Sequence, residues 1–130
     1  LFLRDSFDRT VAALSLYDVL LINPLMDGMN LVAKEGPALN DRGGVVVLSE
    51  GAGAFSELGS EVVGIKDPSN IEETADALEL AIEMGGDDRQ RLASILREKV
   101  ESNRPDDWIE DQVKDLAAIR GGREPLTPAI

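Results

Sequence analysis

The chain has 130 residues, of which 43% are hydrophobic, enough for one domain with a real core or for part of one. It contains no Cys and no His, so disulfides, thiolate nucleophiles, imidazole bases and the usual zinc sites are excluded, and a cytoplasmic location is expected. The formal net charge of -12 disfavours nucleic acid and anionic lipid as partners, and no apolar stretch approaches the length of a membrane span.

Helix-like and strand-like segments alternate in the chain as far as residue 85, which predicts a parallel β-sheet with right-handed crossover helices. Ser6 is expected to cap the first helix. Expected helices cover residues 7–16, 31–39, 54–58 and 71–82, and expected strands cover residues 19–23, 45–49 and 62–65. The first strand is short, aliphatic and followed by Pro24, which is typical of a strand buried on both faces.

The helices expected after the last strand are amphipathic. In the helix capped by residues 67–70, one apolar face comprises Ile71, Ala75, Leu78 and Ile82. After residue 86 the pattern is purely helical, with a first apolar stripe of Leu92, Ile95, Leu96 and Val100. A second stripe, near Pro105, comprises Trp108, Ile109, Val113, Leu116 and Ile119. Residues 121–130 contain two Gly and two Pro and are expected to form a flexible tail.

The ten residues from Met26 to Glu35 follow the first strand and carry most of the functional information. They form a loop and then a helical segment, whose first free N–H groups suit a phosphate. Asp27 and Glu35 flank these groups, and carboxylates accept hydrogen bonds from hydroxyl groups. The arrangement fits a nucleoside diphosphate sugar, with the sugar at Asp27, the ribose at Glu35 and the diphosphate at the backbone of Asn30, Leu31 and Val32. A plain turn, in which Asp27 and Asn30 cap the helix, explains the same residues equally well.

The residues of this motif also carry a family resemblance. Pro24-Leu25 followed by Asp27-Gly-Met-Asn-Leu-Val-Ala-Lys-Glu35 closely resembles the donor-binding motif of the trehalose-6-phosphate synthase family, retaining glycosyltransferases of the GT-B fold. Further matches follow in the same order at Val45-Val-Val-Leu-Ser-Glu50, Ala52-Gly-Ala54, Glu57-Leu58, Thr74-Ala-Asp-Ala-Leu78 and Trp108. The resemblance runs from about Phe7 to about Ile119. It implies an α/β fold with a Rossmann-like parallel sheet and flanking helices, the carboxyl-terminal half of a GT-B domain, ending in helices.

The resemblance implies an enzyme of trehalose biosynthesis that moves glucose from a nucleoside diphosphate glucose to glucose 6-phosphate, giving trehalose 6-phosphate with retention at the anomeric carbon. Asp27 would be the catalytic residue that orients the glucose. The implied substrate-binding residues are Asp27, Gly28, Met29, Asn30, Leu31, Val32 and Glu35. No cofactor and no metal are expected.

The resemblance also implies a domain organisation. Residues 1–104 would be part of the carboxyl-terminal nucleotide-sugar-binding domain, residues 105–120 a terminal helix that crosses to the protein's own amino-terminal domain, and residues 121–130 the tail. In the family, an Arg and a Lys that hold the donor phosphates lie upstream of the segment that this chain resembles. We therefore interpret the chain as a carboxyl-terminal piece of a longer enzyme, inactive by itself.

Three positions depart from the family pattern. Met26 stands where Arg is common, which removes a cation near the sugar or the acceptor. Gly36-Pro37 replaces an aromatic-led continuation and is expected to kink or shorten the helix, and Gly51 stands where an aromatic is common and is expected to loosen the neighbouring pocket. These departures leave open a related transferase that forms glucosylglycerol phosphate or couples cyclitols. A non-catalytic sugar-nucleotide-binding module is a separate alternative. The choice among UDP, GDP and ADP, and the existence of a homo-oligomer, are not determined by the sequence.

Some residues have plainer explanations. The loop 49–53 follows a strand, so it either lines the nucleotide or sugar pocket or merely makes a tight turn. Glu50 and Glu57 are not expected to form a glycosidase-like carboxylate pair. Lys34 is expected to be a solvated lysine, and Trp108 to be either exposed or an ordinary contact between helices.

Overall fold

The structure is a computed structural model, and it describes residues 6–102 and 105–120. The chain divides into two compact units, Leu1–Val100 and Glu101–Ile130. The first unit holds the sheet with its helices, and the second holds one described helix.

The described elements alternate as the sequence pattern predicts. In chain order they are α1 (Phe7–Leu16), β1 (Val19–Ile22), α2 (Val32–Leu39), β2 (Val45–Ser49), α3 (Phe55–Leu58), the 3₁₀ helix η1 (Gly59–Glu61), β3 (Val63–Ile65), α4 (Ile71–Glu83), α5 (Gly86–Ser102) and α6 (Pro105–Arg120). None of the described helices is long and apolar enough to cross a membrane. The expected tail, residues 121–130, lies outside the described residues.

The three strands form one parallel sheet in the order β1-β2-β3. The register runs from Val19↔Val45 to Ile22↔Leu48 between β1 and β2, and from Val47↔Val63 to Ser49↔Ile65 between β2 and β3. The central strand β2 is buried along its whole length because it has a strand on each side and helices on both faces. β1 is an edge strand of the described sheet, and its Leu21 is 43% exposed. The prediction that this first strand is buried on both faces is therefore wrong.

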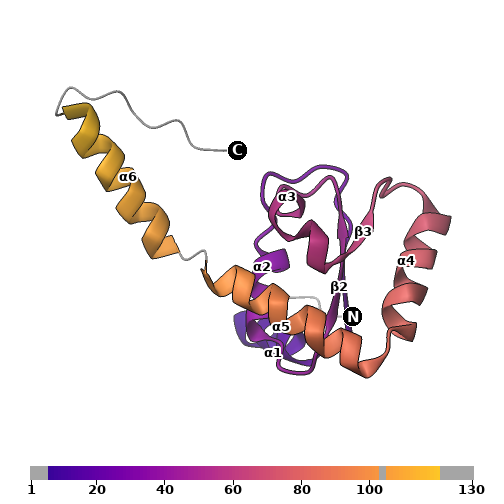
Figure 1. The fold of residues 1–130 in the computed structure, drawn as a ribbon. Helices are drawn as coiled ribbons and strands as arrows, with labels where there is room; N and C mark the ends of the chain where they lie inside the picture. Colours follow the sequence, from indigo (N-terminus) through magenta and orange to yellow (C-terminus); the bar gives the residue numbers. More distant parts are fainter. Residues whose placement is uncertain (1–5, 103–104, 121–130) are drawn as a thin grey trace. The chain divides into compact units, whose positions relative to one another are not determined.

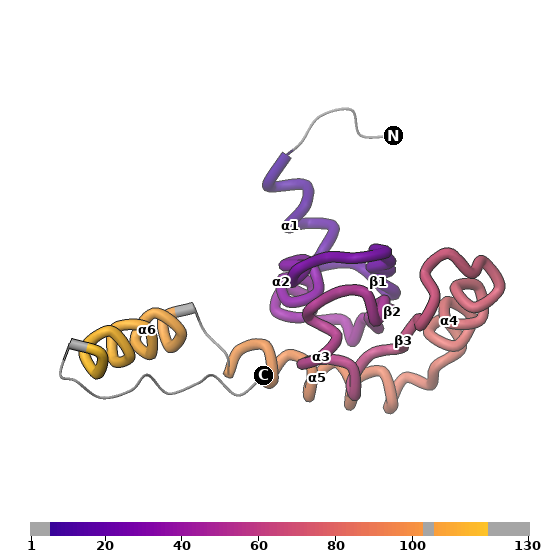
Figure 2. Tube along the Cα trace, turned by 90° about the horizontal axis from the view of Figure 1, so that it is seen from above, coloured from indigo at the N-terminus to yellow at the C-terminus, as the bar shows by residue number. Residues whose placement is uncertain are grey.

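Helices cover both faces of the sheet. One apolar cluster joins α2, α3 and α5 to β1 and β2, and a second cluster joins α4 to β2 and β3. Figure 1 shows α4 on one side of the sheet, and Figure 2, seen from above, shows α2 and α4 on opposite sides. The predicted α/β fold, with a parallel sheet and flanking helices, is confirmed.

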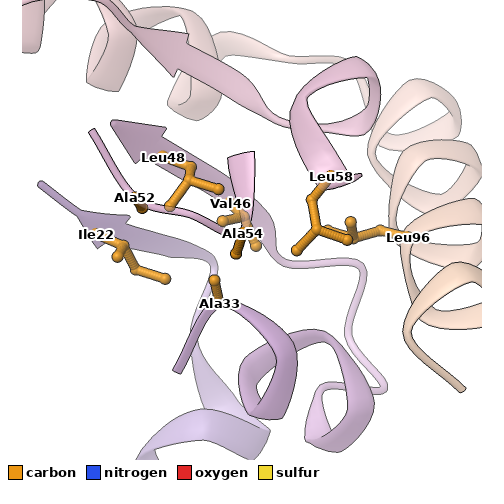
Figure 3. Packing of buried hydrophobic residues seen from close by; sticks show 8 residues of the cluster. All are labelled: Ile22, Ala33, Val46, Leu48, Ala52, Ala54, Leu58 and Leu96. Atoms are coloured by element: carbon orange, nitrogen blue, oxygen red, sulfur yellow. The ribbon is translucent and has the colours of Figure 1, made fainter. Parts of the chain in front are cut away.

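The first cluster packs the start of α2 and the loop after β2 against the sheet. Figure 3 shows its eight buried side chains, which are Ile22, Ala33, Val46, Leu48, Ala52, Ala54, Leu58 and Leu96. Ala33 is fully buried at the start of α2, and its small side chain lets that helix approach the strands closely. Leu58 of α3 and Leu96 of α5 are also buried, so truncating either to alanine should cost about 2–5 kcal/mol of stability.

The helix caps agree with those predicted from the sequence only in part. Asn70 caps α4, because its side chain accepts a hydrogen bond from the backbone N–H of Glu73. Ser6 occupies the predicted N-cap position of α1, and its carbonyl oxygen accepts the backbone N–H of Thr10, but its side chain makes no capping bond. Pro37 lies buried inside α2, which has 8 residues.

The amphipathic faces also differ from expectation. α4 buries Ala77 and Ala81 against the sheet and packs the partly buried Leu78 beside them. Ile71 and Ile82 are 84% and 65% exposed, so the predicted apolar face is only partly the buried one. Alanines permit the closest approach of a helix to a sheet, and this contact decides the orientation of α4. In the second unit, every apolar residue of the α6 stripe is more than half exposed: Trp108, Ile109, Val113, Leu116 and Ile119.

Candidate functional site

The loops that follow the three strands lie along the carboxyl-terminal edge of the sheet. Residues 23–31 follow β1, residues 50–54 follow β2 and residues 66–70 follow β3. Open parallel sheets bind ligands at this edge. The sequence motif therefore lies where the topology favours a binding site, beside the glycine-containing loop after β2.

Asp27 shapes its own loop. Its Oδ1 accepts a hydrogen bond from the backbone N–H of Met29 at 3.1 Å, and its Oδ2 accepts one from Nδ2 of Asn30 at 3.1 Å. A carboxylate offers about four acceptor positions, so each oxygen of Asp27 keeps the capacity to accept a further bond. The side chain is partly exposed, which leaves this capacity open to a hydroxyl group.

Asn30 lies just before α2. Its Oδ1 accepts the backbone N–H of Ala33 at 3.2 Å, and its φ of 71° lies in the left-handed region that Asn tolerates better than most residues. Leu31 occupies the N-cap position of α2, and the side chain of Asn30 caps the N–H of Ala33 from the residue before it. Asp27 supports this bond through the amide group of Asn30. The capping interpretation is correct for Asn30, and it is compatible with ligand binding at the same loop.

The amino-terminal end of α2 is open. Within residues 6–102, the backbone N–H groups of Leu31 and Val32 donate to no acceptor, as first-turn groups of a helix do. The side chains of Leu31 and Val32 are 61% and 38% exposed, so solvent or a ligand reaches this end. Free N–H groups and the positive end of the helix dipole favour an anion here.

Gly28 precedes this helix end in the sequence, and Glu35 follows it. Glu35 lies three residues beyond Val32, about 4.5 Å further along the helix axis, and its side chain is exposed. Gly28 is exposed too, and a Cβ added there would meet nothing within 4 Å. The described fold therefore does not require a glycine at position 28, which leaves the approach of a ligand as a reason for it.

The loop after β2 is joined to the motif loop by the backbone. Asp27 donates its N–H to the carbonyl oxygen of Gly51 at 3.0 Å, and Gly53 donates to the carbonyl oxygen of Asp27 at 2.9 Å. Ala54 donates to the carbonyl oxygen of Met29 at 2.9 Å. A Cβ at Gly51 would collide with the carbonyl oxygen of Leu25, and one at Gly53 with that of Gly28. These glycines permit close contact between the two loops as well as a turn.

Lys34 is not solvated, contrary to the prediction. Its Nζ lies 2.6 Å from Oε2 of Glu57, and the two side chains are only 22% and 27% exposed. Lys34 is thus a half-buried partner of α3 and not a solvated lysine. Glu57 is engaged in this ion pair, and Glu50 is exposed.

Asn23, directly after β1, makes contacts at this edge of the sheet that sequence reasoning missed. Its Nδ2 donates to the carbonyl oxygen of Pro68 at 3.1 Å and to Oγ1 of Thr74 at 3.4 Å, which ties the first loop to the start of α4. Its Oδ1 is buried and accepts no hydrogen bond from the described residues. A polar residue at the end of an aliphatic strand was the only signal.

No group of three or more acidic, His or Cys side chains that could hold a metal ion occurs among the described residues. The polar groups at this edge are instead a partly exposed carboxylate, an exposed carboxylate and an open helix end. This set suits an uncharged polyol joined to a phosphate.

Comparison with known proteins agrees with this geometry. The model of glycosyltransferase family 20 matches residues 1–118. The chain belongs to glycosyltransferase family 20. The predicted resemblance is thereby confirmed, as is the prediction that the chain is part of a glycosyltransferase.

Relatives of this family 20 chain are considerably longer. The trehalose-6-phosphate synthase of Mycobacterium sp. (strain KMS) is 38% identical over 120 residues, which are 92% of this chain and 24% of that protein. The structure of the E. coli trehalose-6-phosphate protein bound with UDP-2-fluoro glucose matches with a TM-score of 0.82 and 34% identity, over 89% of this chain and 26% of that one. The Burkholderia xenovorans α,α-trehalose-phosphate synthase (UDP-forming) in complex with glucose-6-phosphate matches with a TM-score of 0.80 and 32% identity, over 88% and 25%. The chain thus spans about a quarter of the length of these relatives.

Proposed function

We propose that this chain is the donor-binding part of an enzyme that transfers glucose from a nucleoside diphosphate glucose to glucose 6-phosphate, giving trehalose 6-phosphate with retention. The observation that carries the proposal is the open start of α2, with its free N–H groups of Leu31 and Val32 between Asp27 and Glu35. Support also comes from the ligands of two relatives, UDP-2-fluoro glucose and glucose-6-phosphate.

Asp27 would orient the transferred glucose. Its two oxygens already accept bonds from Met29 and Asn30, so their direction is fixed before a sugar arrives. Each oxygen retains room for a sugar hydroxyl group, and such charge-assisted bonds are strong. Gly28 would let the sugar approach the backbone, because its surroundings leave open space. Preorganised acceptors of this kind favour a productive orientation of the substrate.

The diphosphate would meet the backbone from Met29 to Val32, and the ribose hydroxyl groups would meet Glu35. During transfer the bond between the anomeric carbon and the diphosphate oxygen breaks. A bond to the acceptor oxygen forms on the same face of the sugar, and the acceptor's proton passes to the leaving diphosphate. The N–H groups at the start of α2 would stabilise the charge that develops on this leaving group. This scheme requires neither a cofactor nor a protein nucleophile.

Cations for the diphosphate would come from another part of the enzyme. Lys34 is the one basic residue in the motif, and Glu57 already neutralises it. The upstream Arg and Lys implied by the family resemblance would fill this role. The apolar stripe of α6, which includes Trp108, would pack against the amino-terminal domain, and residues 1–104 would belong to the nucleotide-sugar-binding domain.

A related transferase with another acceptor is the second candidate. Met26, which stands where the family commonly has Arg, is 88% exposed beside Asp27. A thioether there cannot pair with a phosphate, which favours an acceptor with less negative charge.

Titration of the full-length gene product with UDP-, GDP- and ADP-glucose tests donor binding. The proposal expects saturable binding of one of the three, and binding at least about tenfold weaker in the Asp27→Ala variant, since a hydrogen bond to a charged group is lost. Binding that is equally strong in Asp27→Ala would contradict the assigned role of Asp27. No binding of any donor would contradict the proposed function.

A further inference from the structure

The side chains of Lys34 and Glu57, which are far apart in the sequence, connect α2 to α3, the helix that follows the loop after β2. Lys34 lies on α2 and Glu57 on α3, and their Nζ and Oε2 atoms are 2.6 Å apart. Both side chains are largely shielded, with 22% and 27% exposure, so water screens their attraction less than it screens a surface pair. The pair therefore restrains α3 relative to α2.

α3 begins where the backbone bridge between the loops ends. Gly53 and Ala54, just before α3, donate to the carbonyl oxygens of Asp27 and Met29. α2 begins where the motif loop ends, because Asn30 caps it. The two segments, each a loop followed by a helix, are thus joined at two places. The backbone hydrogen bonds join the loops, and the ion pair joins the first turns of α2 and α3.

We propose that Lys34 and Glu57 are positioning residues for the donor site, which rests on the proposed function of that site. The ion pair fixes α3 against α2, and α3 holds Gly53 and Ala54 at the carbonyl oxygens of Asp27 and Met29. The carboxylate of Asp27 is thereby presented at one place relative to the open N–H groups of α2. Neither Lys34 nor Glu57 touches the donor; both act through the loops.

A second ion pair in the same unit provides a matched control. Lys99 of α5 lies 2.6 Å from Glu61 of η1, and the two side chains are 33% and 16% exposed. This pair is as short and as shielded as that of Lys34 and Glu57, yet it joins elements outside the motif loop. Lys99→Met should therefore reproduce the loss of an ion pair without disturbing the donor site.

The test compares Lys34→Met, Lys99→Met and the double charge swap Lys34→Glu with Glu57→Lys in the full-length gene product. Hydrogen–deuterium exchange measures the backbone N–H groups of Gly53 and Ala54, and titration measures the dissociation constant for the nucleoside diphosphate glucose that the wild type binds. Lys34→Met should exchange about tenfold faster at both groups and bind the donor about fivefold to tenfold more weakly. The charge swap should recover both properties, and Lys99→Met should leave both unchanged.

Two results would overturn the positioning role. One is unaltered exchange at Gly53 and Ala54 in Lys34→Met, and the other is an equal change in Lys99→Met, which would indicate general destabilisation. The exchange measurement needs no donor. Faster exchange in Lys34→Met that the charge swap reverses therefore supports the coupling of the loops, even if the wild type binds no donor. The absence of donor binding in the wild type would contradict the proposed function alone.

Discussion

Gly53 donates its backbone N–H to the carbonyl oxygen of Asp27, with a distance of 2.9 Å between nitrogen and oxygen. This bond joins the loop after β2 to the backbone of Asp27, whose carboxylate is proposed to bind the sugar. A Cβ at position 53 would collide with the carbonyl oxygen of Gly28, the neighbour of Asp27. The position of the proposed catalytic residue thus depends on a glycine in another loop.

Gly53→Ala should displace the motif loop. The added methyl group meets backbone, which cannot rotate away, so we expect a loss of stability of about 1–3 kcal/mol. Turnover should fall by about a hundredfold, because a small displacement of an orienting group has large effects on rate. Gly85→Ala is the control, since a Cβ there meets nothing within 4 Å. Chemical unfolding and initial rates measure the two effects, and full activity in Gly53→Ala would contradict this dependence.

Gly28→Ala should separate ligand contact from folding. A Cβ at this position meets nothing within 4 Å, so the unfolding free energy should change by less than about 1 kcal/mol. If the sugar approaches the backbone at Gly28, the methyl group should nevertheless raise the donor's Michaelis constant by about tenfold. Stability and donor kinetics of the purified variant check this expectation. A variant with wild-type kinetics would show that no substrate approaches position 28 closely.

Glu35→Ala should weaken donor binding without lowering the stability of the fold. The carboxylate is exposed, and alanine is a good helix former, so stability should change by less than about 0.5 kcal/mol. Loss of a charged acceptor for the ribose hydroxyl groups should raise the donor's Michaelis constant by about tenfold. Glu79→Ala, another exposed carboxylate on a helix, is the matched control. Equal constants for the two variants would remove Glu35 from the ribose site.

Tyr17 should make stability depend on alkaline pH. Burial of its hydroxyl raises the pKa to about 12 from an ordinary 10.0, and the nearby charge of Arg97 lowers the pKa by a smaller amount. The neutral ring is favoured in the folded state, so its contribution is complete below pH 10 and is lost as pH rises towards 12. Because the ring is partly solvated, the loss should amount to about 1–2 kcal/mol.

Urea unfolding at pH 9 and at about pH 12 measures this loss, and Tyr17→Phe should remove it. The phenylalanine ring should still pack against Gly36. The tyrosine ring lies close to this glycine, because a Cβ built at position 36 would be 3.6 Å from the ring. An identical pH dependence in the wild type and in Tyr17→Phe would show that Tyr17 does not titrate in this range.

Local sequence signals predicted the elements of the fold. Aliphatic runs ended by Pro or Gly marked β1 and β2, and Asn70 marked the start of α4. They did not predict that β1 lies at an edge of the described sheet, because the order of strands is a property of tertiary contacts. They also misplaced part of the buried face of α4: Leu78 packs against the sheet as predicted, but the buried alanines are less hydrophobic than Ile71 and Ile82, which remain exposed.

The candidate site was predictable only where one stretch of chain carries it. The motif residues Asp27 and Glu35 could be named from their spacing and resemblance, and their roles in donor binding stay predictions. The pair of Lys34 and Glu57 could not, since 23 positions separate its members and nothing in either neighbourhood marks a partner. The contacts of Asn23 with Pro68 and Thr74 span 45 and 51 positions and were hidden for the same reason.

The most direct test of the proposed function is the identity of the product. The full-length gene product is incubated with glucose 6-phosphate and, in turn, with UDP-, GDP- and ADP-glucose, and the products are analysed by NMR. We expect an α,α-1,1-linked disaccharide phosphate with one of the donors, which would establish the donor, the acceptor and retention together. A product built on another acceptor or linkage, or no transfer from a donor that binds, would contradict the assignment of this chain to trehalose 6-phosphate synthesis.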